Sequence, residues 1–228
     1  MFRLSKLFVV ATPIGNLSDI TYRAVETLKS VDLIVCEDTR VTKILLDHYQ
    51  ITKPMFVINA QNESRKVPEL MDKIGSGLNC AFVSDAGTPS ISDPGTRVVN
   101  SAIKNGIEVI GIPGPSAVTL ALSISGLPTD AFVFEGFLPQ KKGRHTKLKE
   151  LVTEERTIVL YESTYRIEKL LNELNEYFPE RQIAVCRELT KKFEEVWRGT
   201  ASEILSEFDK KVTKGEFVVI IAPASFKL

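Results

Sequence analysis

The sequence is poor in the residue types that build metal sites and disulfide frameworks. Its three cysteines, Cys36, Cys80 and Cys186, are far apart, and there is no Cys-x-x-Cys pair. This pattern argues against a zinc site or a disulfide scaffold and is typical of a protein of the reducing cytoplasm. The two histidines, His48 and His145, stand in no motif of a Ser-His-Asp triad. We therefore expect no metal ligands.

Long apolar runs, net charge and phosphate-binding motifs are also missing. No run approaches the roughly 18 apolar residues of a membrane span, so we predict no membrane association. The early apolar run Leu7–Ala11 leads into a Pro-Gly turn without a signal cleavage site, and we interpret it as a buried strand. With 29 basic and 29 acidic residues the net charge is zero, which disfavours nucleic-acid binding by bulk charge but not by a local patch. The absence of GxGxxG and GxxxxGK[ST] disfavours a nicotinamide cofactor and a nucleotide-dependent hydrolase or kinase.

What is present is a chain that can bury a core, since 43% of its 228 residues are hydrophobic. Apolar runs alternate with amphipathic stretches, which predicts a mainly parallel sheet covered on both faces. The expected strands of the first half are Leu7–Ala11, Leu33–Cys36, Met55–Ile58, Cys80–Val83 and Val109–Ile112. We predict that Ser18 caps one helix, that Thr39 starts another, and that Asp93 and Pro94 open a third.

The segment Gly111–Pro115 interrupts this rhythm, and we place a domain boundary there, giving domains 1–114 and 115–228. A helix is expected from Ser116 to about Ile124. The second half then has its own helix, Arg166–Tyr177, and a further short one at Ser202–Phe208. Its expected strands are Phe132–Phe134, Thr157–Tyr161, Gln182–Cys186, Glu195–Arg198 and Phe217–Ile221. The predicted fold class is α/β with two α/β domains.

Polar segments follow several predicted strands, where ligands of parallel α/β sheets collect. We favour ligand contact for Ser84–Thr88 and a structural helix start for Asp93 and Pro94. We interpret the segment Ile112–Ala117 as a hinge between domains, as a helix start whose backbone amides hold a polar group of a ligand, or as both. The segment Glu37–Arg40 has two equally favoured interpretations. Either Asp38 caps a helix and Glu37 is solvated, or these residues form a functional cluster.

Seven motifs occur in one order: ATPIGNLSDIT, EDTR, SDAGTPSISDPG, IPGPSA, FEGFLP, YES and CRELTKKFEE. Together they resemble the tetrapyrrole methylase superfamily, from about Leu7 to Pro223. The resemblance implies two α/β domains with a cofactor cleft between them, S-adenosylmethionine as the cofactor, and a homodimer. It also implies cofactor contacts at Ile14, Asp85, Thr88, Ser116, Ala117 and Tyr161, and around Glu188.

Two departures narrow the resemblance. Porphyrin and corrin methylases resemble one another in a GxGPGD loop and a GDP motif, whereas this chain has Thr12–Asn16 and Ser84–Gly87. The chain is instead similar to the branch that methylates a cytidine ribose 2′-oxygen in 16S ribosomal RNA, within the small ribosomal subunit. Many relatives carry a further small C-terminal domain, so RNA affinity is expected from the core or a second subunit.

Methyl transfer to a ribose hydroxyl benefits from a base that removes its proton. The candidates are Glu37, Asp38, Asp85, Glu162, Glu188, and Lys191 if burial lowers its pKa, and the sequence does not rank them as bases. Asp85 and Glu188 are the residues that we predict to be catalytic. The expected RNA contacts are Glu37, Arg40, Lys141, Lys142, Arg144 and Lys191. Phe137, Tyr161 and Tyr165 are aromatic residues that could stack on a base.

Two other functions compete with this hypothesis. A methyltransferase acting on a tetrapyrrole or other small molecule would keep the fold and the cofactor. A non-catalytic ribosome-binding module would keep the fold alone, and its RNA binding would not depend on S-adenosylmethionine.

Overall fold

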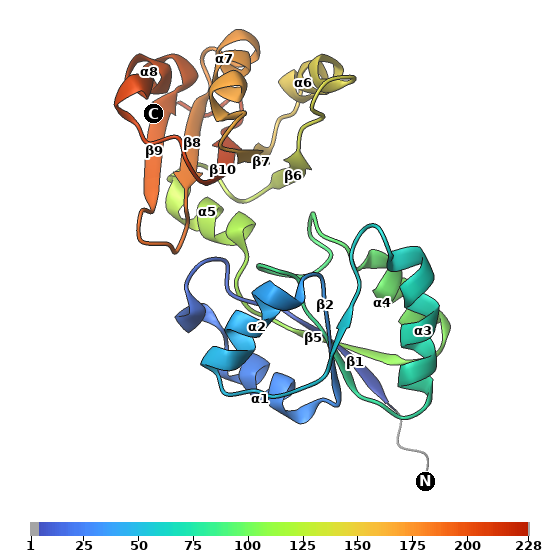
Figure 1. Cartoon of the computed structure of the whole chain (residues 1–228). Helices are drawn as coiled ribbons and strands as arrows, with labels where there is room; N and C mark the ends of the chain where they lie inside the picture. The colour runs from blue at the N-terminus through green and yellow to red at the C-terminus, as the bar shows by residue number, and fades with distance from the viewer. Residues whose placement is uncertain (1–4, 228) are drawn as a thin grey trace. The chain divides into compact units, whose positions relative to one another are not determined.

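The computed structural model describes residues 5–227, which form two compact units divided between Ser116 and Ala117 (Figure 1). The division falls in the Pro-Gly-Pro-Ser segment that follows the last strand of the first unit. Each unit is built on its own sheet.

The first unit is a parallel sheet, as the continuous apolar runs predict. Its order is β3-β2-β4-β1-β5, and every neighbouring pair is parallel. The strands are β1 (Lys6–Val10), β2 (Leu33–Cys36), β3 (Met55–Val57), β4 (Cys80–Phe82) and β5 (Glu108–Ile112). Because both faces are covered, Leu33–Cys36 is buried at every position.

Four helices cover this sheet, two on each face (Figure 1). They are α1 (Tyr22–Ser30), α2 (Thr39–His48), α3 (Glu63–Gly75) and α4 (Thr96–Lys104). Alternate residues of β2 face opposite sides: Ile34 and Cys36 pack with α1 and α2, whereas Leu33 and Val35 pack with α3 and α4.

Two predicted helix starts are wrong. Ser18 lies in a short 3-10 turn, Leu17–Asp19, and the cap of α1 is Thr21, whose hydroxyl accepts from Ala24 N–H at 3.2 Å. Asp93 and Pro94 precede α4 without capping it. The cap position is Gly95, with φ +136° and its N–H donating to Glu63 Oε1. Both helices start later because the preceding residues belong to turns with their own hydrogen bonds or left-handed backbone.

The second unit has a mixed sheet, because only β6 and β7 are parallel. Its order is β6-β7-β10-β8-β9. The strands are β6 (Phe132–Phe137), β7 (Thr157–Ser163), β8 (Gln182–Arg187), β9 (Glu195–Thr200) and β10 (Glu216–Ile221). The expectation of a mainly parallel sheet therefore holds for the first unit alone.

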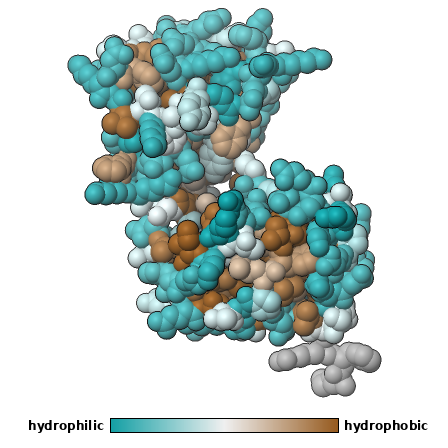
Figure 2. All heavy atoms as spheres, in the orientation of Figure 1, coloured by the Kyte–Doolittle hydropathy of each residue, from teal (hydrophilic) through white to brown (hydrophobic). Residues whose placement is uncertain are grey.

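The helices of the second unit are α5 (Ala117–Ser125), α6 (Arg144–Val152), α7 (Ile167–Tyr177) and α8 (Ala201–Ser206), followed by a 3-10 turn, Phe208–Lys210. Apolar residues of α6, α7 and α8 share one core with β7, β8 and β10, while α5 packs against β8 and β10. Figure 2 shows hydrophilic residues over most of the visible face of this unit. No helix between residues 5 and 227 is long and apolar enough to cross a membrane.

Candidate functional site

The order of the first sheet makes the ends of β1 and β4 a topological switch point. These strands are neighbours, yet the chain leaves β1 for α1 on one face and β4 for α4 on the other. Where adjacent strands of an open α/β sheet connect to opposite faces, ligands bind beyond the carboxyl ends of those strands. The loops that start there begin at Thr12 and Ser84.

Backbone pairing joins these two loops. Thr12 N–H donates to the Gly87 carbonyl at 2.9 Å, and Gly87 N–H returns a bond to the Thr12 carbonyl at 3.0 Å. The buried Thr12 hydroxyl donates to the Ser84 carbonyl at 3.2 Å. The predicted ligand segment Ser84–Thr88 is thus held against the loop after β1.

A third loop meets the other two at Gly87. This residue has φ +75°, and a Cβ atom there would lie 3.3 Å from Ile14 Cγ2 and 3.8 Å from the Pro115 carbonyl oxygen. The Thr88 hydroxyl donates to the same carbonyl at 3.2 Å. Of the residues predicted to bind the cofactor, Ile14 and Thr88 therefore lie together, beside the segment that leads to Ser116.

Carboxylates line the next strand end, after β2. Asp38 N–H donates to Asp85 Oδ1 at 3.2 Å, and Asp38 caps α2 by accepting from Arg40 N–H at 2.8 Å. The Asp38 carboxylate also pairs with the exposed Arg40 guanidinium, whose hydrogen bonds lower the Asp38 pKa to about 2. The capping role predicted for Asp38 is confirmed.

Glu37 is not the solvated residue that the capping interpretation expected. It is half-buried, and its Oε1 is a buried atom with no hydrogen-bond partner. Burial, followed by the charges of Asp93 and Asp85, raises the Glu37 pKa to about 7. Burial also raises the pKa of Asp85 and that of Asp93. The strand ends thus hold carboxyl groups that bind protons more tightly than usual.

The loop from Thr88 to Gly95 carries strain that sequence reasoning missed. Ser90 and Ser92 have φ of +72° and +62°, in a region that serine rarely occupies. A Cβ atom at Gly95 would overlap the Phe82 ring and approach the Ser90 hydroxyl, which is buried without a partner. The only signal in the sequence is the crowding of Ser, Pro and Gly in TPSISDPG. Such strain is typical of functional loops.

In the second unit, Tyr161 on β7 lies between two other rings. Its ring meets Phe134 edge-on at 4.9 Å and Phe137 at 5.6 Å between centroids. Ala117, a predicted cofactor contact, is the first residue of α5. Their roles stay predictions.

Arg144 was expected to contact RNA, and this prediction is wrong. Its side chain is 2% exposed and its guanidinium pairs with Glu173 at 2.7 Å and with Glu162 at 3.4 Å. A buried guanidinium needs such partners because desolvation of an unpaired charge is costly. Arg144 is therefore an internal ion-pair residue that cannot reach a phosphate from this position.

Glu188 and Lys191 form an ion pair at 2.9 Å, and Lys191 contacts Glu216 Oε2 at the same distance. Although burial opposes the charged form, these carboxylates raise the Lys191 pKa. Lys191 therefore keeps its proton, and the idea that burial frees it as a base is wrong. The Lys191 hydrogen bond, acting against burial, lowers the Glu188 pKa, so Glu188 is a weaker base than Glu37.

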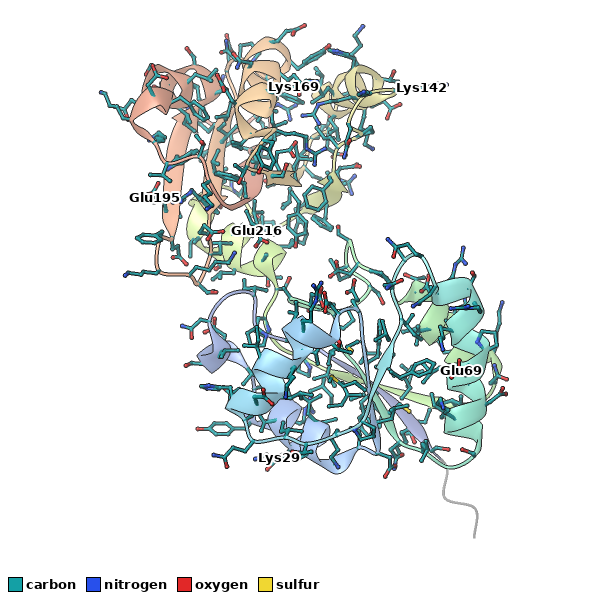
Figure 3. The ribbon with its side chains drawn as sticks, viewed as in Figure 1. Lys29, Glu69, Lys142, Lys169, Glu195 and Glu216 are labelled. Atoms are coloured by element: carbon teal, nitrogen blue, oxygen red, sulfur yellow. The ribbon has the colours of Figure 1, made fainter. Side chains whose placement is uncertain are left out.

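The remaining cations predicted to contact RNA are exposed. Lys141 and Lys142 lie in the loop before α6, and Figure 3 shows Lys142 beside that helix with its side chain at the outer surface. Arg40 is exposed at the start of α2. Their contact with RNA stays a prediction. Among residues 5–227, no cluster of His, Cys, Asp and Glu has the arrangement of a metal site.

Comparison with known families assigns the chain to a family of methylases. Residues 6–205 match the model of the tetrapyrrole (corrin/porphyrin) methylases. The chain belongs to this methylase family.

Two relatives carry one name, ribosomal RNA small subunit methyltransferase I. The protein from Thermotoga maritima is 46% identical over 96% of this chain and 99% of its own length. The protein from Synechocystis is 50% identical over 96% of this chain and 79% of its own length. A solved structure of Thermus thermophilus uroporphyrin-III C-methyltransferase with S-adenosyl homocysteine matches 95% of this chain and 97% of that one, with 16% identity and a TM-score of 0.65. That likeness concerns the fold.

Proposed function

We propose that this protein transfers the methyl group of S-adenosylmethionine to the ribose 2′-hydroxyl of a cytidine in 16S ribosomal RNA, in the cytoplasm. The observation that carries the proposal is the 46–50% identity, over nearly the whole chain, to proteins named as small-subunit ribosomal RNA methyltransferases. The topological switch point at the ends of β1 and β4 supports it, because ligands of open α/β sheets bind at such a point.

The loops beyond the carboxyl ends of the first sheet suit a compact ligand that approaches the backbone. Gly87 and Gly114 present no side chain, and a Cβ atom at Gly114 would lie 3.0 Å from that of Ala11. In this proposal Ile14, Asp85 and Thr88 hold the cofactor from the first unit. Ser116, Ala117 and Tyr161 are the further proposed contacts. When bound, S-adenosylmethionine supplies an activated methyl group on a sulfonium sulfur.

The protein's own part in the chemistry is to orient the ribose and to accept its proton. The 2′-oxygen would form a bond to the methyl carbon as the bond from that carbon to the sulfonium sulfur breaks, leaving a neutral thioether, and the hydroxyl proton would pass to a carboxylate. We favour Glu37, because its pKa of about 7 lies near neutral pH and its Oε1 has no other partner. Asp85, exposed and with a raised pKa, is the second candidate.

The test is to incubate the protein with radiolabelled S-adenosylmethionine and small ribosomal subunits from a strain without this enzyme. The RNA is then digested and the label mapped. Label on a cytidine 2′-oxygen, abolished in Asp85→Asn and kept in Glu26→Gln, would support the proposal. Glu26 is a matched control because it is an exposed carboxylate on α1.

Other outcomes would redirect the proposal. Cofactor binding without label in RNA would overturn the ribosomal acceptor and favour a tetrapyrrole or other small molecule as the acceptor. A tetrapyrrole product is coloured, so absorbance of the purified protein would reveal it. RNA binding that does not respond to S-adenosylmethionine, without any methyl transfer, would indicate a non-catalytic ribosome-binding module. We also propose a homodimer, and sedimentation at monomer mass throughout the micromolar range would contradict it.

A further inference from the structure

An aromatic ring stands exposed where β6 ends. Phe137 is 52% exposed, although a phenylalanine at a strand end usually buries more of its ring. Its backbone is in register with Tyr161 of β7, and the two rings meet edge-on at 5.6 Å. This contact fixes one side of Phe137 and leaves much of the ring in water.

A guanidinium group lies over the same ring. The Cζ atom of Arg166 is 5.8 Å from the Phe137 centroid, within cation–π range. The nearest contacts of Arg166 use Nε, 2.8 Å from Glu162 Oε1 and 3.2 Å from the Ser163 hydroxyl. Its side chain is 23% exposed, so part of it remains open to solvent.

The carboxylate that holds Arg166 is itself fixed. Glu162 has no exposed side-chain surface, and Oε1 accepts the Ser163 N–H at 2.9 Å. The other oxygen, Oε2, faces the buried guanidinium of Arg144 at 3.4 Å. Two guanidinium groups and one amide thus orient Glu162, and Glu162 keeps Arg166 beside Phe137.

The loop that follows Phe137 in the chain is cationic. Phe137 leads into the loop that carries the exposed Lys141 and Lys142. Exposed rings, preorganised guanidinium groups and exposed lysines are the elements with which proteins bind single-stranded nucleic acid. Bases stack on aromatic faces, and cations contact phosphates.

We propose that Phe137 and Arg166 form a platform for one unpaired nucleotide of the RNA. The base stacks on Phe137, and Arg166 donates to a neighbouring phosphate. Glu162 is a positioning residue that acts through Arg166. This inference rests on the proposed function, because it takes RNA as the substrate, and it names residues that recognise it.

The experiment measures steady-state methylation of small ribosomal subunits, together with the cofactor Kd by calorimetry. Phe137→Ala is expected to lower kcat/KM for subunits about tenfold, mainly through KM, while Phe137→Trp restores it. Phe132→Ala, which truncates another exposed ring on β6, is the matched control and should change little. Arg166→Ala should weaken subunit binding and reduce its log–log salt slope by about 0.7, the share of one phosphate contact.

Glu162 is tested by a double-mutant cycle. If it acts through Arg166, Glu162→Gln weakens subunit binding in the wild-type background but adds little to Arg166→Ala. If Glu162 were merely structural, Glu162→Gln would weaken subunit binding by the same factor in both backgrounds. That result would overturn the positioning role.

Wild-type kcat/KM in Phe137→Ala, with RNA still methylated, would overturn the platform and leave the proposed function standing. A change in sedimentation in Phe137→Ala would also overturn it, because the ring would then contact a second copy of the chain. If the wild-type protein binds cofactor but neither binds nor methylates subunits, the proposed function fails first and this inference with it.

Discussion

Gly215 lies directly against the side chain of Glu188. A Cβ atom at Gly215 would sit 2.6 Å from Glu188 Cγ and 2.9 Å from Cδ, and the glycine has φ +143°. Glu188 itself has φ +50°, and its carboxylate accepts the Glu216 N–H at 3.0 Å. The close approach holds the Glu188 carboxylate between Lys191 and the start of β10.

Gly215→Ala is expected to lower the free energy of unfolding by about 2–4 kcal/mol. The new methyl group both overlaps Glu188 and occupies a backbone region closed to alanine. Urea unfolding measures the change. Gly126→Ala is the control, because Gly126 has φ +77° but nothing within 4 Å of an added Cβ atom. Equal losses in the two variants would show that the contact with Glu188 contributes nothing.

Glu37 should make stability fall as pH rises. Its folded pKa of about 7 exceeds the unfolded value of 4.5, so between these pH values the unfolded chain loses the proton first. Ionisation therefore favours unfolding, and the free energy of unfolding decreases from pH 4.5 to 7. After allowance for solvent screening the decrease is about 1–2 kcal/mol. Glu37→Gln should remove it, as measured by urea unfolding across this pH range.

Glu26→Gln is the control for that series, because it removes one carboxylate from an exposed position on α1. Its profile should follow the wild type. If the pH profile of Glu37→Gln also matched that of the wild type, the raised pKa of Glu37 would be wrong. The main reason to favour Glu37 as the base would then be lost.

Arg144→Met should destabilise the second unit by about 3 kcal/mol. The substitution keeps an unbranched side chain as far as the position of Nε but leaves the buried carboxylates of Glu162 and Glu173 without their shared cation. Arg156→Met removes an exposed arginine of the same unit and should change stability far less, because exposed ion pairs contribute little. Denaturant midpoints distinguish the two. A midpoint for Arg144→Met equal to that of Arg156→Met would show that the buried ion pairs contribute little.

Lys141→Ala combined with Lys142→Ala should weaken binding to small ribosomal subunits and flatten its salt dependence. Each lost phosphate contact lowers the log–log slope by about 0.7. The paired control is Lys104→Ala with Lys53→Ala, which removes the same charge from the first unit. Filter binding at salt concentrations from about 50 to 200 mM, which span the physiological ionic strength, measures the slopes. If both double variants had the same log–log salt slope, the weaker salt dependence would come from the change in net charge alone.

The amino-acid sequence by itself determined most of the strands and the edge of the first sheet at which the polar segment Ser84–Thr88 lies. Apolar runs such as Leu33–Cys36 fall on strands because burial on both faces of a parallel sheet demands continuous apolar residues. The polar segment Ser84–Thr88 follows one of these strands, so its place at a carboxyl edge could be predicted. Both inferences need only local pattern and the rules of α/β folds.

The tertiary structure alone decided which charged residues are available. Arg144 stands in a run of cations, yet Glu173, 29 residues away, holds it in the core. Glu37 stands in a polar segment, yet burial and the carboxylates of Asp85 and Asp93 keep its proton near neutral pH. Exposure and pKa depend on partners brought together by folding, and a linear motif carries neither distance nor desolvation.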